Sequence, residues 1–190
     1  LHILVEGMVE LYARAEAREA TMAVLRPVST FILAASIRDQ PYLMSARTVQ
    51  RSRILMIPSA DLRVALAADI RFANNVMNDL AGCYRSMSRH AKTLKLRNSR
   101  ERIAAYLLRQ SRLLGHAPGY TLPVEKRLLA SYLGMTPENL SRALKSLAED
   151  GCKVDGQRVI ITNRARLTAL ARPSLMLDGP DADAAQAGVS

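Results

Sequence analysis

Three polar residues in the second half of the chain, Glu138, Ser141 and Arg142, are spaced so that a single helical face would carry them all. Arg donates two hydrogen bonds to guanine O6 and N7, Glu accepts one from cytosine N4, and Ser bonds either type of base. Side chains one helical turn apart point the same way and can touch neighbouring base pairs together. The spacing favours contacts with base edges, and the alternative is a solvated charged face on a surface helix.

Two short helices around a tight turn, over residues 128–149, must position these side chains. Ala130 is small where the helices would approach closely, and Gly134 suits a turn that excludes a side chain or needs a positive φ. Thr136 is a good N-cap, and Pro137 follows at the first helical position. The apolar face opposite the polar stripe consists of Leu140, Ala143, Leu144 and Leu147. The pattern predicts a helix-turn-helix.

The segment PVEKRLLASYLGMTPENLSRALKSLAEDG resembles the helix-turn-helix of the Crp/Fnr superfamily of bacterial transcription regulators. Its Glu138-x-x-Ser141-Arg142 signature is similar to the reading head of the Fnr type and of the nitrogen-oxide-responsive regulators on that side of the family. The resemblance covers nearly the whole chain and implies a half-site similar to TTGAT. It places Arg142 on the guanine, Glu138 near it on the opposite strand and Ser141 on a thymine. The other DNA-binding residues that we expect are Thr136, Pro137, Lys145, Lys126 and Arg127.

The charge of the chain is concentrated in its second half. Residues 91–172 hold sixteen Lys and Arg against six Asp and Glu, an excess that equals the net charge of +10 of all 190 residues. A basic segment attached to a neutral one indicates a polyanion-binding domain joined to something else. With six Tyr, two Phe and no Trp, the chain has little material for stacking single-stranded bases, so duplex DNA is the better partner.

Other compositional signals place the protein in the cytoplasm. No apolar run approaches the roughly 18–20 residues that span a bilayer, so no membrane partner is expected. Cys83 and Cys152 lie far apart without metal-ligand spacing, which favours buried thiols in a reducing compartment. The chain begins at Leu1 and not at an initiator Met, so we expect its natural N-terminus to be missing.

Short strand-like runs punctuated by Gly and Pro cover residues 1–60 and indicate part of a barrel or sandwich. In the family that the chain resembles, the sensor is a cyclic-nucleotide-type β-roll. Leu1 falls inside that roll, several strands after its start, so the resemblance implies a partial β-roll whose N-terminal part is missing.

Residues 30–49 align with the family's phosphate-binding cassette, where a Gly-Glu pair holds the ribose and an Arg pairs with the cyclic phosphate. Here Ile32-Leu33 stands for the first pair, and Tyr42-Leu43 supplies no guanidinium. A buried phosphate without its cation is strongly disfavoured. Arg38 and Arg47 do not sit at the matching position, so we expect no cAMP binding.

Residues 61–97 read as one long helix with an apolar seam that repeats every seven residues. The resemblance implies that this helix is the homodimer interface, whereas an ordinary amphipathic helix packed on its own barrel is the alternative. The seam residues are Ala73, Val76, Leu80, Cys83, Met87 and Leu94, with His90 in the same series.

The remaining residues complete a winged helix-turn-helix over residues 98–172. Asn98 and Glu101 have the spacing of a capping box, and Asp155-Gly156 signals a two-residue hairpin turn, which would be the wing. Residues 173–190 read as an acidic flexible tail. The expected fold class is α+β, made of the partial β-roll, the dimerisation helix and the winged domain.

The leading hypothesis is a homodimeric, sequence-specific transcription regulator, and the resemblance implies RNA polymerase as a further partner. The alternative is a sensor module that regulates a protein partner and not DNA. The chain carries no nucleophile elbow, P-loop, dinucleotide fingerprint or metal-ligand pair, so no enzyme is expected. The signal stays open among nitrogen oxide, oxygen and redox state, and haem is a conceivable cofactor through His2, His90 or His116.

Overall fold

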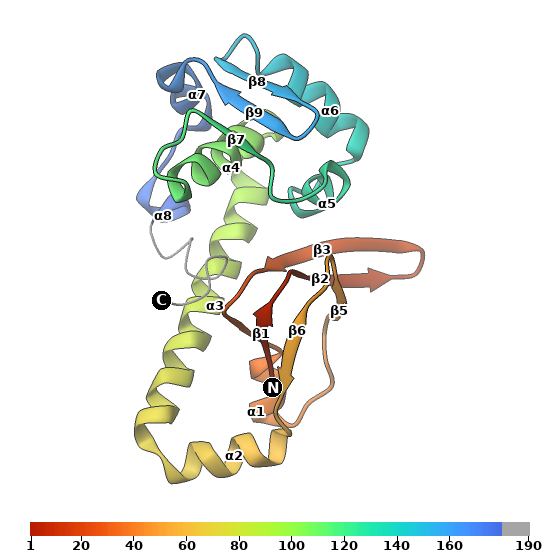
Figure 1. The fold of residues 1–190 in the computed structure, drawn as a ribbon, viewed down its shortest axis with the longest axis vertical. Helices are drawn as coiled ribbons and strands as arrows, with labels where there is room; N and C mark the ends of the chain where they lie inside the picture. Colours follow the sequence, from red (N-terminus) through yellow and green to blue (C-terminus); the bar gives the residue numbers. More distant parts are fainter. Residues whose placement is uncertain (180–190) are drawn as a thin grey trace. The chain divides into compact units, whose positions relative to one another are not determined.

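The structure, a computed structural model, describes residues 1–179. The chain forms two compact units, the first ending at Ser88 and the second beginning at Arg89. One long helix, α3 (Ile70–Leu96), continues from the first unit into the second (Figure 1). Among the described residues no helix is long and apolar enough to cross a membrane.

The first unit contains two antiparallel three-stranded sheets, ordered β4-β1-β6 and β3-β2-β5. Their strands are β1 (His2–Glu6), β2 (Val9–Ala15), β3 (Arg18–Leu25), β4 (Ser29–Phe31), β5 (Ser45–Thr48) and β6 (Arg53–Met56). Alternate residues of β1 and β2 point inward, and Leu4, Val9 and Leu11 form a core with Leu25 and Phe31. These strands lie within residues 1–60, where strand-like runs are expected, and only β4, with three residues, is too short to show an alternating pattern.

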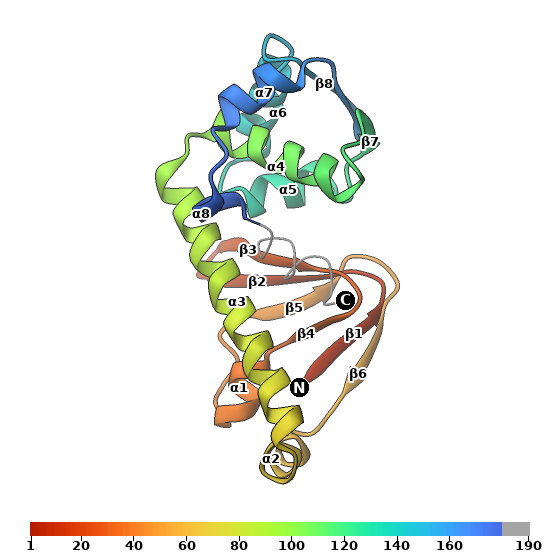
Figure 2. The same ribbon diagram turned by 90° about the vertical axis from the view of Figure 1, so that its left-hand side faces the viewer.

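Helices α1 (Leu33–Arg38), α2 (Ser59–Ala68) and the first half of α3 pack on a second core of this unit. Leu1, Leu33, Leu62 and Val76 are its buried members, and Figure 2 shows α1 beside the first half of α3. The single helix expected over residues 61–97 is wrong, because the chain breaks at Asp69 into α2 and α3. Asp69 is extended, and its Oδ1 accepts the backbone N–H groups of Arg71 and Phe72, which starts a new helix.

Some apolar residues of α3 pack on this core, and others are exposed to solvent. Val76 is buried against its own unit and Leu80 packs partly on the same core, so these two expected seam residues follow the packed-helix alternative. Ile70, Met77 and Tyr84, seven residues apart, are 72%, 57% and 75% exposed and form a different stripe. The other expected seam residues are Met87, Cys83 and Leu94, which are exposed, and Ala73, which is half-buried.

The second unit begins its globular part with α4 (Ser99–Leu113), whose N-terminus is capped as expected. The Asn98 side chain accepts from the Glu101 N–H at 3.0 Å, and the Glu101 carboxylate accepts from the Asn98 N–H at 2.9 Å. This reciprocal capping box satisfies two donors that a helix leaves unpaired. Ile103, Ala104 and Leu107 of α4 are fully buried and anchor the core of the unit.

A three-stranded antiparallel sheet, ordered β7-β9-β8, and a further helix complete the second unit. The elements are β7 (Gly119–Thr121), β8 (Cys152–Asp155), β9 (Arg158–Ile161) and α7 (Arg164–Ala171). The expected hairpin is confirmed, but its turn lies one residue later than the expected Asp155-Gly156, because Asp155 pairs with Arg158 and Gly156 and Gln157 form the turn. Strand β7 was not expected, because its short run pairs only with the distant β9.

The last described element, α8 (Leu175–Asp178), is fastened to the junction between α3 and α4. The Asp178 carboxylate accepts two hydrogen bonds from the Arg97 guanidinium, at 2.8 and 2.6 Å, and the Arg97 side chain is only 5% exposed. Arg97 also donates to the Arg172 carbonyl, and Arg112 to the Asp178 carbonyl. Residues 173–179 of the expected tail therefore include an anchored helix, and the rest of that tail lies outside the described residues.

The Arg97–Asp178 pair generates a prediction about stability. Asp178→Asn leaves a buried guanidinium without its anion, so we expect the free energy of unfolding to fall by about 3 kcal/mol at pH 7. Burial alone would raise the pKa of Asp178, but hydrogen bonds from Arg97 and from the Ser174 N–H lower it overall. A lowered carboxyl pKa stabilises the fold above the unfolded pKa of about 3.9, and the effect is lost as pH falls through the folded pKa.

Denaturant titrations of the two proteins from pH 7 to pH 2 test this prediction. The gap between wild type and Asp178→Asn should close at the acidic end. Asp155→Asn, an exposed carboxylate of the β8–β9 hairpin, is the matched control and should be nearly neutral. An Asp178→Asn protein as stable as wild type at pH 7 would show that α8 is not held by this pair.

Candidate nucleic-acid interface

Helices α5 (Lys126–Tyr132) and α6 (Pro137–Ser146) form the expected pair around a tight turn. Gly134 has φ +64°, so the turn needs glycine for its conformation, and a Cβ there would also lie 3.0 Å from Leu94 Cδ2 and displace that side chain slightly. Ala130 is completely buried where the two helices meet, as expected from its small side chain. The short-range pattern therefore predicted the helix-turn-helix geometry correctly.

The N-terminus of α6 has the expected cap. The Thr136 hydroxyl accepts from the Asn139 N–H at 3.2 Å, and Pro137 occupies the first turn of the helix. Thr136 has extended φ and ψ, so the chain turns sharply into α6 at this residue. The cap fixes where the helix begins and hence which residues share each of its faces.

Burial separates the two faces of α6. Leu140 and Leu147 are 0% exposed and Leu144 is 3% exposed, and each buried leucine contributes roughly 1.5–3 kcal/mol. Ala143 is half-buried beside them. The opposite face is exposed and carries Glu138, Ser141, Arg142 and Lys145, with Thr136 and Pro137 exposed at its start. The structure brings the predicted reading residues together on one solvent-facing surface.

The Glu138 carboxylate is held at the start of α6. The pKa of Glu138 is lowered, first by its own backbone N–H and then by the Thr136 hydroxyl. The positive charge of Arg142 lowers it further. The carboxylate stays ionised at neutral pH and acts as an acceptor only. An ionised acceptor on this face suits a base-edge amino group such as cytosine N4.

Asn139 is a residue of this surface that sequence reasoning missed. Its side-chain oxygen accepts a hydrogen bond from the Arg142 guanidinium, one helical turn away. The spacing of Asn139 and Arg142 is a helical i, i+3 pair, which was a signal available in the sequence. The side chain is exposed, as are those of Glu138 and Arg142.

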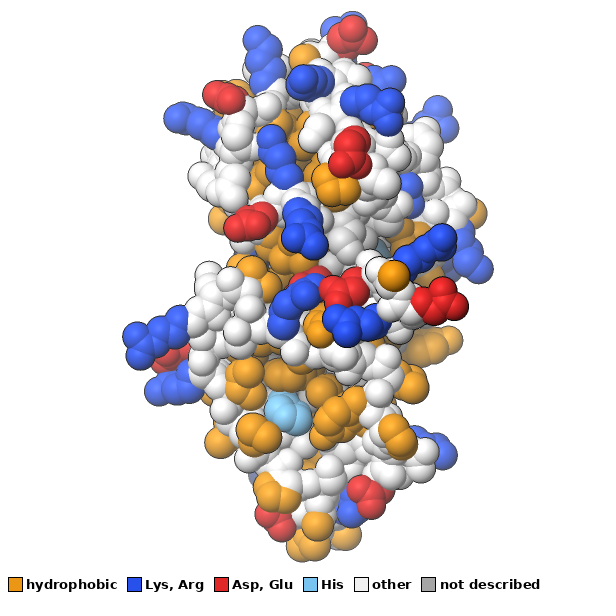
Figure 3. Space-filling view, turned by 90° about the vertical axis from the view of Figure 1, so that its right-hand side faces the viewer, with side chains coloured by type: hydrophobic (Ala, Val, Ile, Leu, Met, Phe, Trp, Pro, Cys, Tyr) orange, Lys and Arg blue, Asp and Glu red, His pale blue; other side chains and the backbone are white. Residues whose placement is uncertain are grey.

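Basic residues around the two helices differ in whether they are free to contact DNA. Arg127 and Lys145 are exposed, and Lys126 is half-buried at the start of α5. Arg97 is occupied by Asp178 and Arg100 by Asp150, so these cations of the α3–α4 junction are paired within the unit. Lys153 and Arg158 of the hairpin are exposed cations that sequence reasoning did not single out. Lys and Arg side chains gather over the face of this unit in Figure 3.

The first unit contains a cavity of about 580 Å³. Its lining comprises His2, Val9, Arg14, Phe31, Ile32, Tyr42, Leu43, Met44, Ser45, Ala46, Arg47, Thr48 and Ile54. The cavity thus includes residues of the expected phosphate-binding cassette. Most of the lining is apolar. The charge of a ligand that the cavity can bind therefore depends on the guanidinium groups of Arg14 and Arg47.

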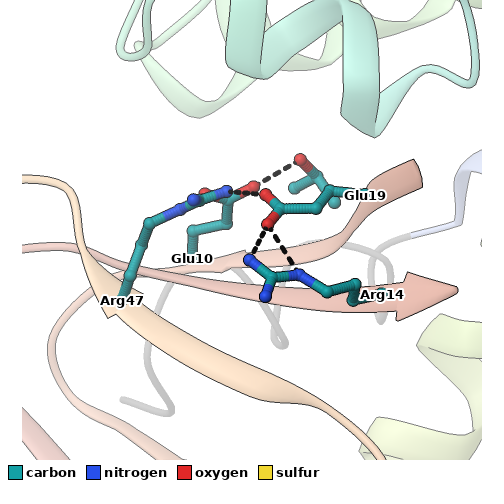
Figure 4. Close-up of polar contacts among 5 residues, drawn as sticks. Glu10, Arg14, Glu19 and Arg47 are labelled. Atoms are coloured by element: carbon teal, nitrogen blue, oxygen red, sulfur yellow. Dashed lines mark hydrogen bonds and ion pairs between the residues drawn. The ribbon is translucent and has the colours of Figure 1, made fainter. Parts of the chain in front are cut away.

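Both arginines of the cavity are neutralised by carboxylates of the same unit (Figure 4). Arg47 donates to Glu10 at 2.6 Å and to Glu19 at 3.0 Å, and Arg14 pairs with Glu19. Hydrogen bonds to Glu10 and then to Glu19 raise the pKa of Arg47 above its ordinary value. Arg47 reaches the cavity but brings no net charge to it, because Glu10 and Glu19 accompany it.

The other cassette positions also depart from a nucleotide site. Leu33, where the family has its ribose-binding Glu, is buried in the core with Leu1 and Leu62. Ile32 stands where the family has Gly and keeps a left-handed φ of +63°, which is uncommon for a β-branched residue. Tyr42 and Leu43 are exposed apolar lining residues. None of these four side chains carries a charge that could pair with a phosphate.

The three histidines occupy separate environments. His2 lines the cavity of the first unit and contacts the ring of Phe31. His90 stacks on Tyr132 of α5 with ring centroids 4.6 Å apart, and burial, then Arg109 and Arg102, lower its pKa. His116 lies in the turn after α4. Within residues 1–179, no three His, Cys, Asp or Glu side chains gather as a candidate metal site.

Comparisons with known proteins agree with this architecture. The family model of the cyclic nucleotide-binding domain matches residues 1–69, and that of the Crp-like helix-turn-helix domain matches residues 101–170. A search of the curated proteins gave no match.

Solved structures match nearly the whole chain. FixK2 from Bradyrhizobium japonicum is 26% identical, with a TM-score of 0.75, and the match covers 91% of this chain and 87% of that one. A CRP-family transcriptional regulator from Thermus thermophilus is 21% identical, with a TM-score of 0.70 and coverage of 93% and 89%. A CooA mutant from Carboxydothermus hydrogenoformans is 16% identical, with a TM-score of 0.72 and coverage of 90% and 78%.

These last two matches support the fold alone, whereas the two family models and the FixK2 match also support the family. The expected fold class, a β-roll sensor followed by a C-terminal helix-turn-helix domain, is confirmed. The chain belongs to the Crp/Fnr superfamily and is a transcription regulator with a DNA-binding helix-turn-helix.

Proposed function

We propose that this chain acts as a homodimer that reads a TTGAT-like palindrome through α6 and responds to a signal other than cAMP. The observation that carries the proposal is the exposed polar face of α6, which holds Glu138, Ser141 and Arg142 over a buried leucine face. Arg142 reads the guanine of each half-site, Glu138 accepts from a base on the opposite strand, and Ser141 contacts a thymine.

Cations other than the three base-reading residues position the protein on the duplex. Arg127, Lys126 and Lys145 contact phosphates, which adds affinity without sequence information. Lys153 and Arg158 on the β8–β9 hairpin extend the same set, because both are exposed. Arg97 and Arg100 are left out of it, since Asp178 and Asp150 already neutralise them.

The dimer forms along α3. Ile70, Met77 and Tyr84 repeat every seven residues and are exposed, as are Met87 and Leu94. A stripe of large apolar side chains on a helix 27 residues long is the pattern of a two-helix seam. The interface thus keeps Met87 and Leu94 of the expected series, whereas Val76 is excluded because it is already buried in its own unit.

The sensor responds to nitrogen oxide, oxygen or redox state and not to a cyclic nucleotide. The support is the cavity chemistry, in which Glu10 and Glu19 neutralise Arg47 and Leu33 replaces a carboxylate. A cyclic phosphate entering that cavity would have to break the ion pairs of Arg47 or remain unpaired, and both are costly.

The base-reading proposal is tested by fluorescence anisotropy on a TTGAT-N4-ATCAA duplex and a scrambled duplex of equal composition. Wild type should prefer the palindrome. Arg142→Ala removes the bidentate guanine contact, so it should lose roughly 1–3 kcal/mol on the palindrome and much less on the scrambled duplex. Equal losses on both duplexes would mean that Arg142 contacts phosphate only.

The dimer proposal predicts the behaviour of two substitutions on α3. Met77→Glu and Met87→Glu place like charges against their symmetry mates, so the dimer dissociation constant should rise at least about tenfold, or about 1.4 kcal/mol. Asn78→Glu, exposed on the same helix but off the stripe, is the matched control. Sedimentation equilibrium measures all three, and unchanged dimers in both Met variants would place the interface elsewhere.

The effector proposal predicts that cAMP leaves the melting temperature unchanged. A ligand that binds only the native state adds RT ln(1 + [L]/Kd), roughly 2.7 kcal/mol at a hundredfold excess over Kd. Differential scanning calorimetry with cAMP, and with AMP as a control for non-specific effects, should show no saturable rise. A rise with cAMP alone would reverse the assignment of Tyr42 and Leu43 as substitutes for the phosphate-binding residues.

A further inference from the structure

The first turn of α6 carries a connected set of hydrogen bonds on the proposed reading face. The Asn139 N–H donates to the Thr136 hydroxyl, and the Arg142 guanidinium donates to the Asn139 side-chain oxygen. The Glu138 carboxylate is bonded by its own N–H and by Thr136. Each of the two charged side chains therefore has a neutral partner within the helix.

This arrangement replaces an ion pair that the sequence would otherwise favour. Glu138 and Arg142 are four residues apart, with the acid N-terminal to the base, which is the better order for a helical salt bridge. Within the described residues they form no salt bridge, and the Arg142 guanidinium donates instead to the Asn139 side-chain oxygen. Both charges thus remain available to a base edge.

The partner of Arg142 leaves most of its hydrogen-bonding capacity unused. A guanidinium carries several N–H donors in a planar fork, and the bond to Asn139 uses one nitrogen. An amide oxygen is a weaker acceptor than a carboxylate, so the bond is easily extended or exchanged when a guanine arrives. Holding a long side chain in advance lowers the ordering cost that binding would otherwise carry, a difference of about two- to tenfold in affinity.

We propose that Asn139 is a positioning residue of the reading face, which holds the Arg142 guanidinium ready for guanine and out of an ion pair with Glu138. The inference rests on the proposed base-reading function. It adds Asn139, which acts through its contact with Arg142 and not through a contact with the base. It also explains the distribution of partners on α6, because the capping residue Thr136 bonds both Asn139 and Glu138.

A double-mutant cycle on DNA tests the inference. Wild type, Asn139→Ala, Arg142→Ala and the double variant are titrated against the TTGAT-N4-ATCAA palindrome and a version with the half-site guanine replaced by adenine. Asn139→Ala should weaken palindrome binding about two- to tenfold and reduce discrimination against the adenine version. In the Arg142→Ala background, Asn139→Ala should have no effect on either duplex.

Stability and side-chain mobility provide readouts that a purely structural role would not produce. Ala has a higher helix propensity than Asn, so the melting temperature of Asn139→Ala should not fall. In DNA-free protein, the NMR order parameter of the Arg142 Nε–H should drop in Asn139→Ala. Asn139→Asp keeps the acceptor oxygen but adds a charge, so it should restore that order parameter while guanine discrimination stays below that of wild type. Asn78→Ala, an exposed amide on α3, is the matched control and should change neither quantity.

The outcomes separate this inference from the function on which it rests. Wild type that binds both duplexes and a scrambled one equally would overturn the base-reading function and the inference together. Wild type that discriminates, with an Asn139→Ala loss just as large in the Arg142→Ala background, would overturn the inference alone. An unchanged Arg142 order parameter in Asn139→Ala would also overturn it, without reference to DNA.

Discussion

The burial of three leucines of one short helix and its C-terminus is the interaction on which the reading surface depends. Leu140, Leu144 and Leu147 are almost completely inaccessible, and α6 contacts α4, α5 and β8. Since the helix can bury only one face, this packing fixes the opposite face in solvent. The Thr136 cap sets the first residue of the helix, so small changes of register that would rotate the polar residues inward are disfavoured. This packing therefore exposes the proposed reading face before any contact with DNA is made.

Internal ion pairs then decide which cations of this basic protein remain free for a partner. Asp178 and Asp150 occupy Arg97 and Arg100, and Glu10 with Glu19 occupies Arg47 and Arg14. Counting charges along the sequence would assign all of these arginines to anion binding. Because each is paired with a carboxylate, it is less able to bind a further anion, and this effect is largest at Arg97, whose guanidinium is buried. Arg142 is different because its partner is the neutral amide of Asn139, which leaves the net positive charge on the reading face.

Short-range signals predicted the helix-turn-helix, the Asn98 capping box and the β8–β9 hairpin, because each depends on a few adjacent residues with specific backbone preferences. Features that depend on distant partners were missed. Strand β7 exists through its pairing with β9, α8 through the Arg97–Asp178 bond, and the burial of Val76 through contacts with Leu1, Leu33 and Leu62. The break at Asp69 is a different case, since an Asp that caps the amides of Arg71 and Phe72 was readable but lay within a continuous apolar repeat. Asn139 was missed because sequence reasoning considered residues that touch bases and not those that hold them.

The proposed reading of guanine by α6 through the major groove can be tested by methylation interference. Methylating guanine N7 removes an acceptor that the major groove presents to an Arg side chain, while leaving phosphates and the minor groove unchanged. Palindromic duplexes methylated once per molecule on average are separated into bound and free fractions with the wild-type protein. Duplexes methylated at the guanine of either TTGAT half-site should be depleted from the bound fraction, whereas duplexes methylated at guanines outside the half-sites should not. An even distribution of methylated guanines between the two fractions would contradict it.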